Sequence, residues 1–231
     1  MKKYLKKIMN SNKMTKSIID AVRKTRNDNL HRKTIDTIKK HGHIIVQEIE
    51  RCLDNSDLIY FATCGTLLGL IRENRLLQND YDMDYGVIIN SPSDWETLAI
   101  ALNEIGYKKI REFLLDEKIT EQTYRHQNGV EIDFFGHFIE NDSLCFYSYD
   151  RIPEMNYPSE NLWTAYRLNN GQFKGTKKIE TDIGMVTVPV NAEEYLTYNY
   201  NDDWMIPNPN FKANTGKGCN IIKGKFGIIR Y

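Results

Sequence analysis

Apolar positions follow a helical period between residues 34 and 53. The apolar side chains that recur there at intervals of three, four and seven residues are Ile35, Ile38, Ile45, Ile49 and Leu53. This spacing predicts an amphipathic helix. Gly42 lies inside the segment and costs about 1 kcal/mol against Ala, but the repeat continues beyond it. A helix is therefore the first predicted element.

A continuous apolar run over residues 58–64 comes next, bounded by Asp57 and Gly65. A short run of this kind is typical of a strand that is buried on both faces. The chain then turns at Gly65 and Thr66 into a second predicted helix, residues 67–73.

The middle of the chain alternates strands and a helix. Residues 83–89 predict a strand, and Ser93 with Glu96 forms a capping box for a helix that reaches about residue 103.

Two alternating segments, residues 118–126 and 130–138, then flank Gln127-Asn128-Gly129. Asn-Gly between such segments is the strongest short hairpin signal. A further strand is expected over residues 144–149.

The last third of the chain begins with residues 153–170, which are rich in Pro, Asn and aromatic residues and predict irregular structure. A strand pair over residues 172–180 and 185–189 precedes a final helix, residues 192–200, capped by Asn191. The elements together predict an α+β fold in which helices flank a sheet.

Composition and charge add an N-terminal extension to this picture. The chain has 231 residues, 41% hydrophobic content and a formal net charge of zero, which suits a globular protein. Residues 1–40 hold 13 basic and 3 acidic side chains, whereas the rest holds 18 and 28. We therefore divide the chain into a basic N-terminal helical arm, residues 1–40, and a folded domain, residues 41–231.

The basic arm has two interpretations. A charge run is usually a solvated helical face. The alternative is contact with an anionic surface, since each Lys or Arg gains about 1 kcal/mol near anionic lipid headgroups. The segment has no uninterrupted apolar region typical of an export signal, and no apolar run is long enough to span a bilayer. We expect a cytoplasmic protein, with the inner face of the membrane as an alternative location, and no nucleic-acid partner.

The four cysteines, at positions 52, 64, 145 and 219, have no C-x-x-C spacing. A chain of this size does not need disulfide bonds, so reduced thiols in a cytoplasm fit best. Two disulfides in a secreted protein are the alternative.

Candidate chemistry begins with Asp80, Asp82 and Asp84, which alternate with other residues. In an extended chain the three carboxylates project from one face. Neighbours about 6 to 7 Å apart repel each other unless a cation lies between them. Hard oxygen ligands suit Mg²⁺ or Mn²⁺, particularly when a substrate phosphate completes the coordination.

Alternating acids also occur on exposed strand edges, where they discourage aggregation. Two other features favour the metal site. Gly65 and Thr66 lie where a buried strand enters a helix, a place whose backbone N–H groups can hold a phosphate. Asp133 lies within an apolar strand, where a lone charge is costly without a partner.

These residues belong to blocks that resemble a known family. C-G-T-L-L-G-L-I-R at 64–72 and D-Y-D-M-D-Y-G at 80–86 resemble the paired blocks of the LicD/fukutin-related proteins. Y-N-D-D-W-M-I-P at 200–207 resembles the C-terminal block of that family. The chain departs from the family pattern at three positions, which are Asn79 for Trp, Tyr81 for Asp and Asn201 for Gly.

The resemblance implies a nucleotidyltransferase-like catalytic domain over residues 41–231. It also implies transfer of phosphocholine or a similar alcohol or alditol phosphate from a CDP-linked donor to a hydroxyl of a cell-surface glycan, such as a polysaccharide or lipopolysaccharide. Because Asp82 and Asp84 match the family pattern, the metal site is expected to be intact, whereas the pocket for the donor head group is open to change.

Chemical roles follow for the carboxylates. Asp82 and Asp84 are expected to hold Mg²⁺ or Mn²⁺ against the donor diphosphate. Asp133 is expected to complete the metal site and to orient or deprotonate the acceptor hydroxyl.

Further contacts with substrate are expected from two parts of the chain. Gly65, Thr66 and Arg72 are candidate phosphate contacts, although an ion pair with Glu73 explains Arg72 equally well. Asp203 and Trp204 are candidate substrate contacts, with a turn cap and a core position as their alternatives. No role is assigned to the histidines at positions 126 and 137.

Two other function classes stay open. The same carboxylates support a nucleotidyltransferase that adds NMP from an NTP to a small molecule or macromolecule. A non-catalytic binding module is the third hypothesis, but such a module has no reason to keep carboxylates that repel each other without metal.

Overall fold

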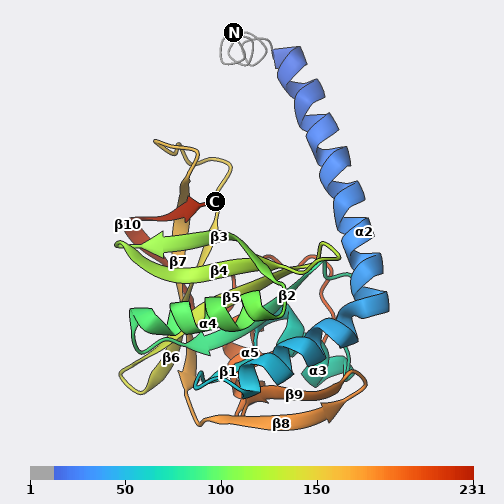
Figure 1. Ribbon diagram of the computed structural model, residues 1–231. Coiled ribbons are helices and arrows are strands. Elements are labelled where there is room, and N and C mark those ends of the chain that lie inside the picture. The colour runs from blue at the N-terminus through green and yellow to red at the C-terminus, as the bar shows by residue number, and fades with distance from the viewer. Residues whose placement is uncertain (1–12) are drawn as a thin grey trace.

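The computed structural model describes residues 13–231 and shows a mixed sheet with flanking helices (Figure 1). The helices are α2 (Lys13–Asp54), α3 (Cys64–Glu73), α4 (Pro92–Glu104) and α5 (Ala192–Tyr200). The strands are β1 (Tyr60–Ala62), β2 (Asp82–Ile88), β3 (Lys108–Leu115), β4 (Lys118–Arg125), β5 (Glu131–Glu140), β6 (Ser143–Asp150), β7 (Leu162–Gln172), β8 (Thr176–Thr181), β9 (Gly184–Pro189) and β10 (Cys219–Arg230). The predicted α+β class is confirmed.

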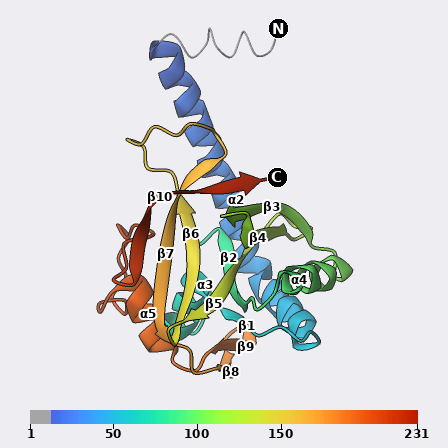
Figure 2. The ribbon, with the colours of Figure 1, turned by 90° about the vertical axis from the view of Figure 1, so that its left-hand side faces the viewer.

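The main sheet has eight strands in the order β1-β2-β5-β4-β3-β10-β7-β6, and β6 also pairs with β5. This last pairing closes β5, β4, β3, β10, β7 and β6 into a ring of strands. Figure 2 shows β6, β7 and β10 on one side of the ring and β3, β4 and β5 on the other. β2 runs parallel to β5, and the other pairs of the sheet are antiparallel.

Helix α2 is much longer than the predicted helix, and its N-terminal part extends away from the domain (Figure 1). Its C-terminal part packs on the core, where Ile45, Ile49 and Leu53 are fully buried. A Cβ on Gly42 would lie 2.6 Å from Leu76 Cδ1. Gly42 therefore permits a close approach of the helix that compensates its low helix propensity.

The predicted boundary at residue 40 lies within α2, which continues through it without a break. Residues 1–12 of the predicted basic arm lie outside the described part of the chain. In residues 13–231, no helix is long and apolar enough to cross a membrane. All four cysteines are free.

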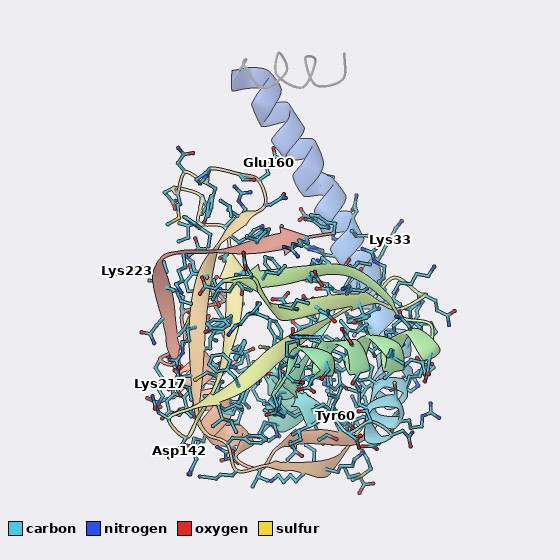
Figure 3. The ribbon with its side chains drawn as sticks, turned by 60° about the vertical axis from the view of Figure 1, so that its left-hand side comes forward. Lys33, Tyr60, Asp142, Glu160, Lys217 and Lys223 are labelled. Carbon is cyan, nitrogen blue, oxygen red and sulfur yellow. The ribbon has the colours of Figure 1, made fainter. Side chains whose placement is uncertain are left out.

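The small β8–β9 sheet is joined to α2 by the buried carboxylate of Glu50. This carboxylate accepts hydrogen bonds from the Thr187 backbone N–H at 3.1 Å, the Thr187 hydroxyl at 2.7 Å and the Tyr60 hydroxyl at 3.0 Å. Lys178 Nζ lies 3.4 Å away. Figure 3 shows Tyr60 beside this sheet. Glu50 is thus a buried acid whose hydrogen-bonding capacity is met within the fold.

Several predicted elements are confirmed, including the last helix, residues 192–200, and the hairpin around Asn128-Gly129. The capping box was placed wrongly, because Ser91 and Asp94 form it and Pro92 is the first helical residue. The irregular segment was also wrong from residue 162 onward, where β7 pairs with both β6 and β10.

Candidate active site

The predicted carboxylates lie on two neighbouring parallel strands. Asp82 and Asp84 are on β2, and β2 pairs with β5 so that Asp84 is opposite Asp133 and Asp82 is opposite Glu131. Side chains that are opposite each other in a sheet share a face. The fold therefore brings Asp82, Asp84 and Asp133 together, although Asp133 is 49 residues from Asp84 in the sequence.

The line through Asp84 and Asp133 continues across the sheet. Asp133 is opposite Thr123 on β4, and Thr123 is opposite Arg111 on β3. The Thr123 hydroxyl donates a short hydrogen bond to Asp133. Arg111 donates to Glu131 at 3.0 Å through Nη1 and to Asp133 at 3.1 Å through Nη2. Asp133 is therefore held from two sides by groups that stabilise its ionised form.

The turn into α3 lies directly against Asp84. The Gly65 N–H donates to Asp84 Oδ2 at 2.9 Å, and the Asp84 N–H donates to Thr66 Oγ1 at 2.9 Å. A Cβ on Gly65 would lie 2.5 Å from Asp80 Oδ2 and 3.3 Å from Asp84 Oδ2, so a side chain here would displace the carboxylate of Asp80.

Gly65 and Thr66 consequently have different places in the site. Gly65 lines the cavity described below. Thr66 is buried and uses its hydroxyl to fix the backbone of Asp84. In this structure Thr66 thus supports a carboxylate and does not face the space where a phosphate would lie.

The site carboxylates are arranged unfavourably for their ionised forms. Burial, followed by repulsion from Asp133 and Asp80, raises the pKa of Asp82 to about 7. Burial and repulsion from Asp82, Asp133 and Asp80 raise the pKa of Asp84 well above its ordinary value. Burial also raises the pKa of Asp133, although Arg111 and Thr123 act in the opposite direction. A cation among these groups would relieve the repulsion.

The carboxylates of Asp82, Asp84 and Asp133 are not arranged around one common cation position in this structure. Among the described residues, no three His, Cys, Asp or Glu side chains form a ready-made metal cluster. Asp133 is directed to Arg111 and Thr123, and one oxygen of Asp84 accepts the Gly65 N–H. Joint coordination of a cation would therefore require side-chain rotation.

The carboxylates line a cavity of about 1780 Å³. Its wall also includes α2, since His31 stacks on Tyr81 with ring centroids 4.0 Å apart and an interplanar angle of 3°. Tyr81 lies between Asp80 and Asp82 in the sequence. Helix α2 thus contributes directly to the wall beside the carboxylates.

The C-terminal block of the sequence supplies another part of the cavity wall. Trp204 is buried in the hydrophobic core and also lines the cavity, so its two interpretations are not exclusive. Asp203 is exposed and lines the cavity. Arg72 donates to Glu73 at 2.9 Å and to the Trp204 carbonyl at 3.3 Å. The predicted ion pair with Glu73 is present, and Arg72 also lines the cavity.

Sequence reasoning missed three residues of this site. Arg111 lies on β3, for which no strand was predicted, and Thr123 lies on a predicted strand but without an assigned role. Glu121 is a fourth buried carboxylate on the cavity wall. The alternation of Glu121, Thr123 and Arg125 along one predicted strand was the available signal, because it places three polar side chains on one face.

Comparison with known protein families identifies the family of the chain that carries this site. The family model of the LicD/FKTN/FKRP nucleotidyltransferase domain matches residues 57–185, which include all three aspartates. The chain belongs to the LicD/FKTN/FKRP family. The nucleotidyltransferase-like fold expected from the sequence is therefore confirmed, whereas the bounds of the domain, residues 41–231, stay a prediction.

Two relatives in this family have the same name. The chain is 23% identical to "Ribitol-5-phosphate transferase FKTN" of Mus musculus over 75% of this chain and 36% of that protein. It is 22% identical to the protein of the same name from Macaca fascicularis, over 73% of this chain and 34% of that protein. The chain thus spans about a third of the length of these relatives.

Solved structures resemble the chain only weakly. The lincomycin-bound crystal structure of lincosamide antibiotic adenylyltransferase LnuA has a TM-score of 0.40 and 12% identity, covering 67% of this chain and 84% of that one. Terminal uridylyl transferase 4 from Trypanosoma brucei with bound GTP has a TM-score of 0.28 and 12% identity, covering 46% of this chain and 36% of that one. Both likenesses are too weak to support a conclusion about the reaction.

Proposed function

We propose that the chain is a metal-dependent phosphotransferase that moves an alcohol or alditol phosphate, such as phosphocholine or ribitol phosphate, from a CDP-linked donor to a hydroxyl of a cell-surface glycan. The observation that carries the proposal is the set of Asp82, Asp84 and Asp133 on adjoining strands, inside a large cavity of a LicD/FKTN/FKRP nucleotidyltransferase domain. The name of the FKTN relatives supports a phosphate-containing group as the cargo.

The residues present fit Mg²⁺ or Mn²⁺. Asp82, Asp84 and Asp133 offer hard oxygen donors, and burial together with repulsion from neighbouring aspartates raises the pKa of Asp82 and Asp84. These three would hold the metal. When bound, it would supply positive charge that neutralises the donor diphosphate as the nucleotide leaves.

The protein groups then position the reactants. Gly65, at the start of α3, and Arg72 face the cavity and would hold donor phosphate oxygens. The acceptor hydroxyl oxygen attacks the phosphorus that carries the alcohol, the bond from that phosphorus to the CMP oxygen breaks, and CMP leaves. In this structure Arg111 and Thr123 hold the carboxylate of Asp133. After the side-chain rotation that joint coordination requires, Asp133 would receive the hydroxyl proton.

The test is product analysis with purified protein, Mg²⁺ and the organism's own surface glycan. CDP-ribitol, CDP-glycerol and CDP-choline serve as donors, and mass spectrometry identifies the modified glycan. We expect CMP to be released in proportion to transfer. Transfer of NMP from an NTP with release of pyrophosphate would instead support the nucleotidyltransferase alternative.

We also propose that the basic segment, residues 1–40, contacts an anionic membrane and so brings the domain close to glycan intermediates. Removal of residues 1–16 should then reduce cosedimentation with anionic liposomes without changing turnover on a soluble acceptor, and added salt should weaken the binding. Equal sedimentation of the truncated and complete chains at low salt would contradict this part of the proposal.

A further inference from the structure

The cavity extends beyond the catalytic carboxylates along the same face of the sheet. The row that contains Asp133 and Thr123 is followed, two residues along the strands, by a second row. Its members are paired directly, Phe135 with Glu121 and Glu121 with Phe113. Two residues along a strand correspond to about 7 Å. Phe113, Glu121 and Phe135 all line the cavity.

Glu121 is therefore a carboxylate between two phenylalanines, one row away from the proposed metal site. Its side chain is 95% removed from solvent, with 5% relative exposure. Burial and the proximity of Asp133 raise its pKa well above the ordinary value. In the described part of the chain its carboxylate has no hydrogen-bond partner, whereas buried Glu50 accepts hydrogen bonds from Thr187 and Tyr60.

The buried side-chain atoms that lack a hydrogen bond in the described residues do not include the oxygens of Glu121, and Glu121 lines the cavity. Its carboxyl group therefore opens onto the cavity, where the hydroxyl of a ligand can reach it. Both neighbouring rings pack against other aromatic rings. Phe113 stacks on Tyr149 at 4.4 Å and meets Trp163 edge to face at 5.5 Å, and Phe135 meets Phe146 edge to face at 5.3 Å. The second row thus combines the carboxyl group of Glu121, which can accept hydrogen bonds from a ligand, with the apolar rings of Phe113 and Phe135.

We propose that Glu121, together with Phe113 and Phe135, forms a subsite for a neutral, hydroxyl-rich group, either an alditol or a sugar. The carboxylate accepts hydrogen bonds from ligand hydroxyls, and the ring faces pack on ligand C–H groups. This inference rests on the proposed function and deepens it, because a group bonded to a phosphate beside Asp84 and Asp133 would extend toward the next row, which lies about 7 Å further along the strands.

Arg111 is opposite Thr123 and thus diagonal to Glu121 on the same face. Its guanidinium is already bound to Glu131 and Asp133. The comparison of CDP-ribitol with CDP-choline therefore decides between a neutral and a cationic head group.

The hydroxyl-rich group has two sources, the donor head group and the glycan acceptor. Calorimetric titration distinguishes them when CMP, CDP-ribitol and CDP-choline are each titrated with Mg²⁺, and free acceptor oligosaccharide is titrated without nucleotide or metal. The variants are Glu121→Ala, which removes the acceptor, and Glu121→Gln, which keeps an acceptor oxygen but removes the charge. Glu112→Ala is the matched control, because Glu112 lies on the opposite face of β3 and pairs with Lys109.

For a donor subsite we expect Glu121→Ala to weaken CDP-ribitol binding roughly tenfold and CMP binding not at all, the scale of one lost hydrogen bond. For an acceptor subsite, Glu121→Ala should instead weaken the binding of the oligosaccharide. Glu121→Gln should retain most of the affinity in either case, and Glu112→Ala should change nothing. Unchanged CMP binding also shows that the variants are folded.

Two results would overturn the subsite. In one, Glu121→Ala binds CDP-ribitol and oligosaccharide as the unmodified chain does. In the other, Glu121→Gln loses affinity for CDP-choline alone, which identifies a cation site. If the unmodified chain binds neither CMP nor any CDP-alcohol with Mg²⁺, the proposed function fails, and this outcome is distinct from CMP binding without any head-group preference.

Discussion

The paired strands β2 and β5 carry polar side chains at both ends. The side chains at one end repel each other, whereas at the other end they are neutral and hydrogen-bonded. At one end, Asp84 is opposite Asp133 and Asp82 is nearby, so like charges meet. At the other end, Ile88 is opposite His137, which is fully buried. Burial lowers the pKa of His137 to about 3, so its ring is neutral at physiological pH.

The hydrogen bonds at the His137 end determine which nitrogen carries the proton. His137 Nδ1 lies 3.0 Å from the Phe135 carbonyl oxygen, which only accepts, so Nδ1 is the donor. His137 Nε2 therefore accepts from the Tyr195 hydroxyl at 2.8 Å, and Tyr195 in turn accepts from Thr63 at 2.6 Å. This end forms a complete, neutral network.

The contrast distinguishes a neutral, fully hydrogen-bonded cluster from the cluster of carboxylates that we propose as the metal site. The fold neutralises His137 and gives each of its ring nitrogens a partner, as is usual for buried polar groups. The same two strands leave Asp82 and Asp84 repelling each other, an arrangement that lowers stability unless a cation is present. Substitutions at the two ends should therefore have opposite effects on stability and activity.

The largest effect is expected from Asp82→Asn or Asp84→Asn. Each substitution should abolish Mg²⁺-dependent transfer, because it removes a ligand and a negative charge. Without metal, the melting temperature should stay the same or rise, since repulsion is relieved. Transfer assays and thermal unfolding in EDTA measure both quantities. A variant that keeps more than a few per cent of activity, or that loses stability in EDTA, contradicts the assignment.

Asp133→Ala should separate chemistry from binding. Donor and Mg²⁺ should still bind, while turnover should fall roughly 10²- to 10⁴-fold, the scale of lost general acid–base catalysis, or further if a metal ligand is lost as well. Asp82→Ala should also lose metal-assisted donor binding. Calorimetry on the two variants provides the comparison, and the division of roles is refuted if Asp133→Ala fails to bind donor while Asp82→Ala binds it normally.

Arg111→Met tests whether Asp133 depends on its cationic partner. Loss of a partly buried ion pair should lower the free energy of unfolding by about 2 kcal/mol, less than for a fully buried pair because the side chain of Arg111 is 26% exposed. Adding Asp133→Asn should recover part of the loss, because the orphaned charge is removed. Urea unfolding of both single variants and the double variant measures the coupling, and simple additivity would show that the pair is not coupled.

Local patterns in the sequence were sufficient for much of the site. Residues 80–84 alternate, and alternation alone places Asp82 and Asp84 on one face. The Asn128-Gly129 turn predicts the hairpin of β4 and β5, which the structure confirms. The pairing of β2 with β5, which brings Asp133 beside Asp84, was not predicted, and only the family resemblance and the cost of a lone buried charge linked the two residues.

Other parts of the fold depend on pairings that no local pattern encodes. β10 contains two glycines and three lysine or arginine side chains, and it is held as a strand by β7 and β3. β3 begins with Lys108-Lys109, and such a charged start does not predict a strand. Because β3 was missed, so was Arg111, the side chain that holds Asp133. The difference between Glu50 and Glu121 likewise depends on tertiary partners and is invisible in the sequence.

The end of β2 and β5 that carries His137 should give the smallest effect, a gradual dependence of the free energy of unfolding on pH. The pKa of His137 is about 3 in the folded chain, below its ordinary value of 6.5. Above pH 6.5 the ring is neutral in both states and contributes no pH dependence. Between pH 6.5 and about 3 only the unfolded chain takes up the proton, so this group lowers the free energy of unfolding by about 1.4 kcal/mol per pH unit.

His137→Gln should remove this dependence. The variant will be less stable than the unmodified chain at pH 7.5, because packing and the Tyr195 hydrogen bond are altered. The difference in free energy of unfolding between the two proteins should decrease as the pH falls from 6.5 to 5. Taking the difference between the two proteins in urea cancels the titration of the carboxylates, which both share. Tyr195→Phe is the control, since it removes a hydroxyl but leaves His137 buried and should keep the pH dependence. A constant gap between His137→Gln and the unmodified chain would mean that His137 is accessible to protons in the folded state, and the contrast between the two ends of β2 and β5 would then be lost.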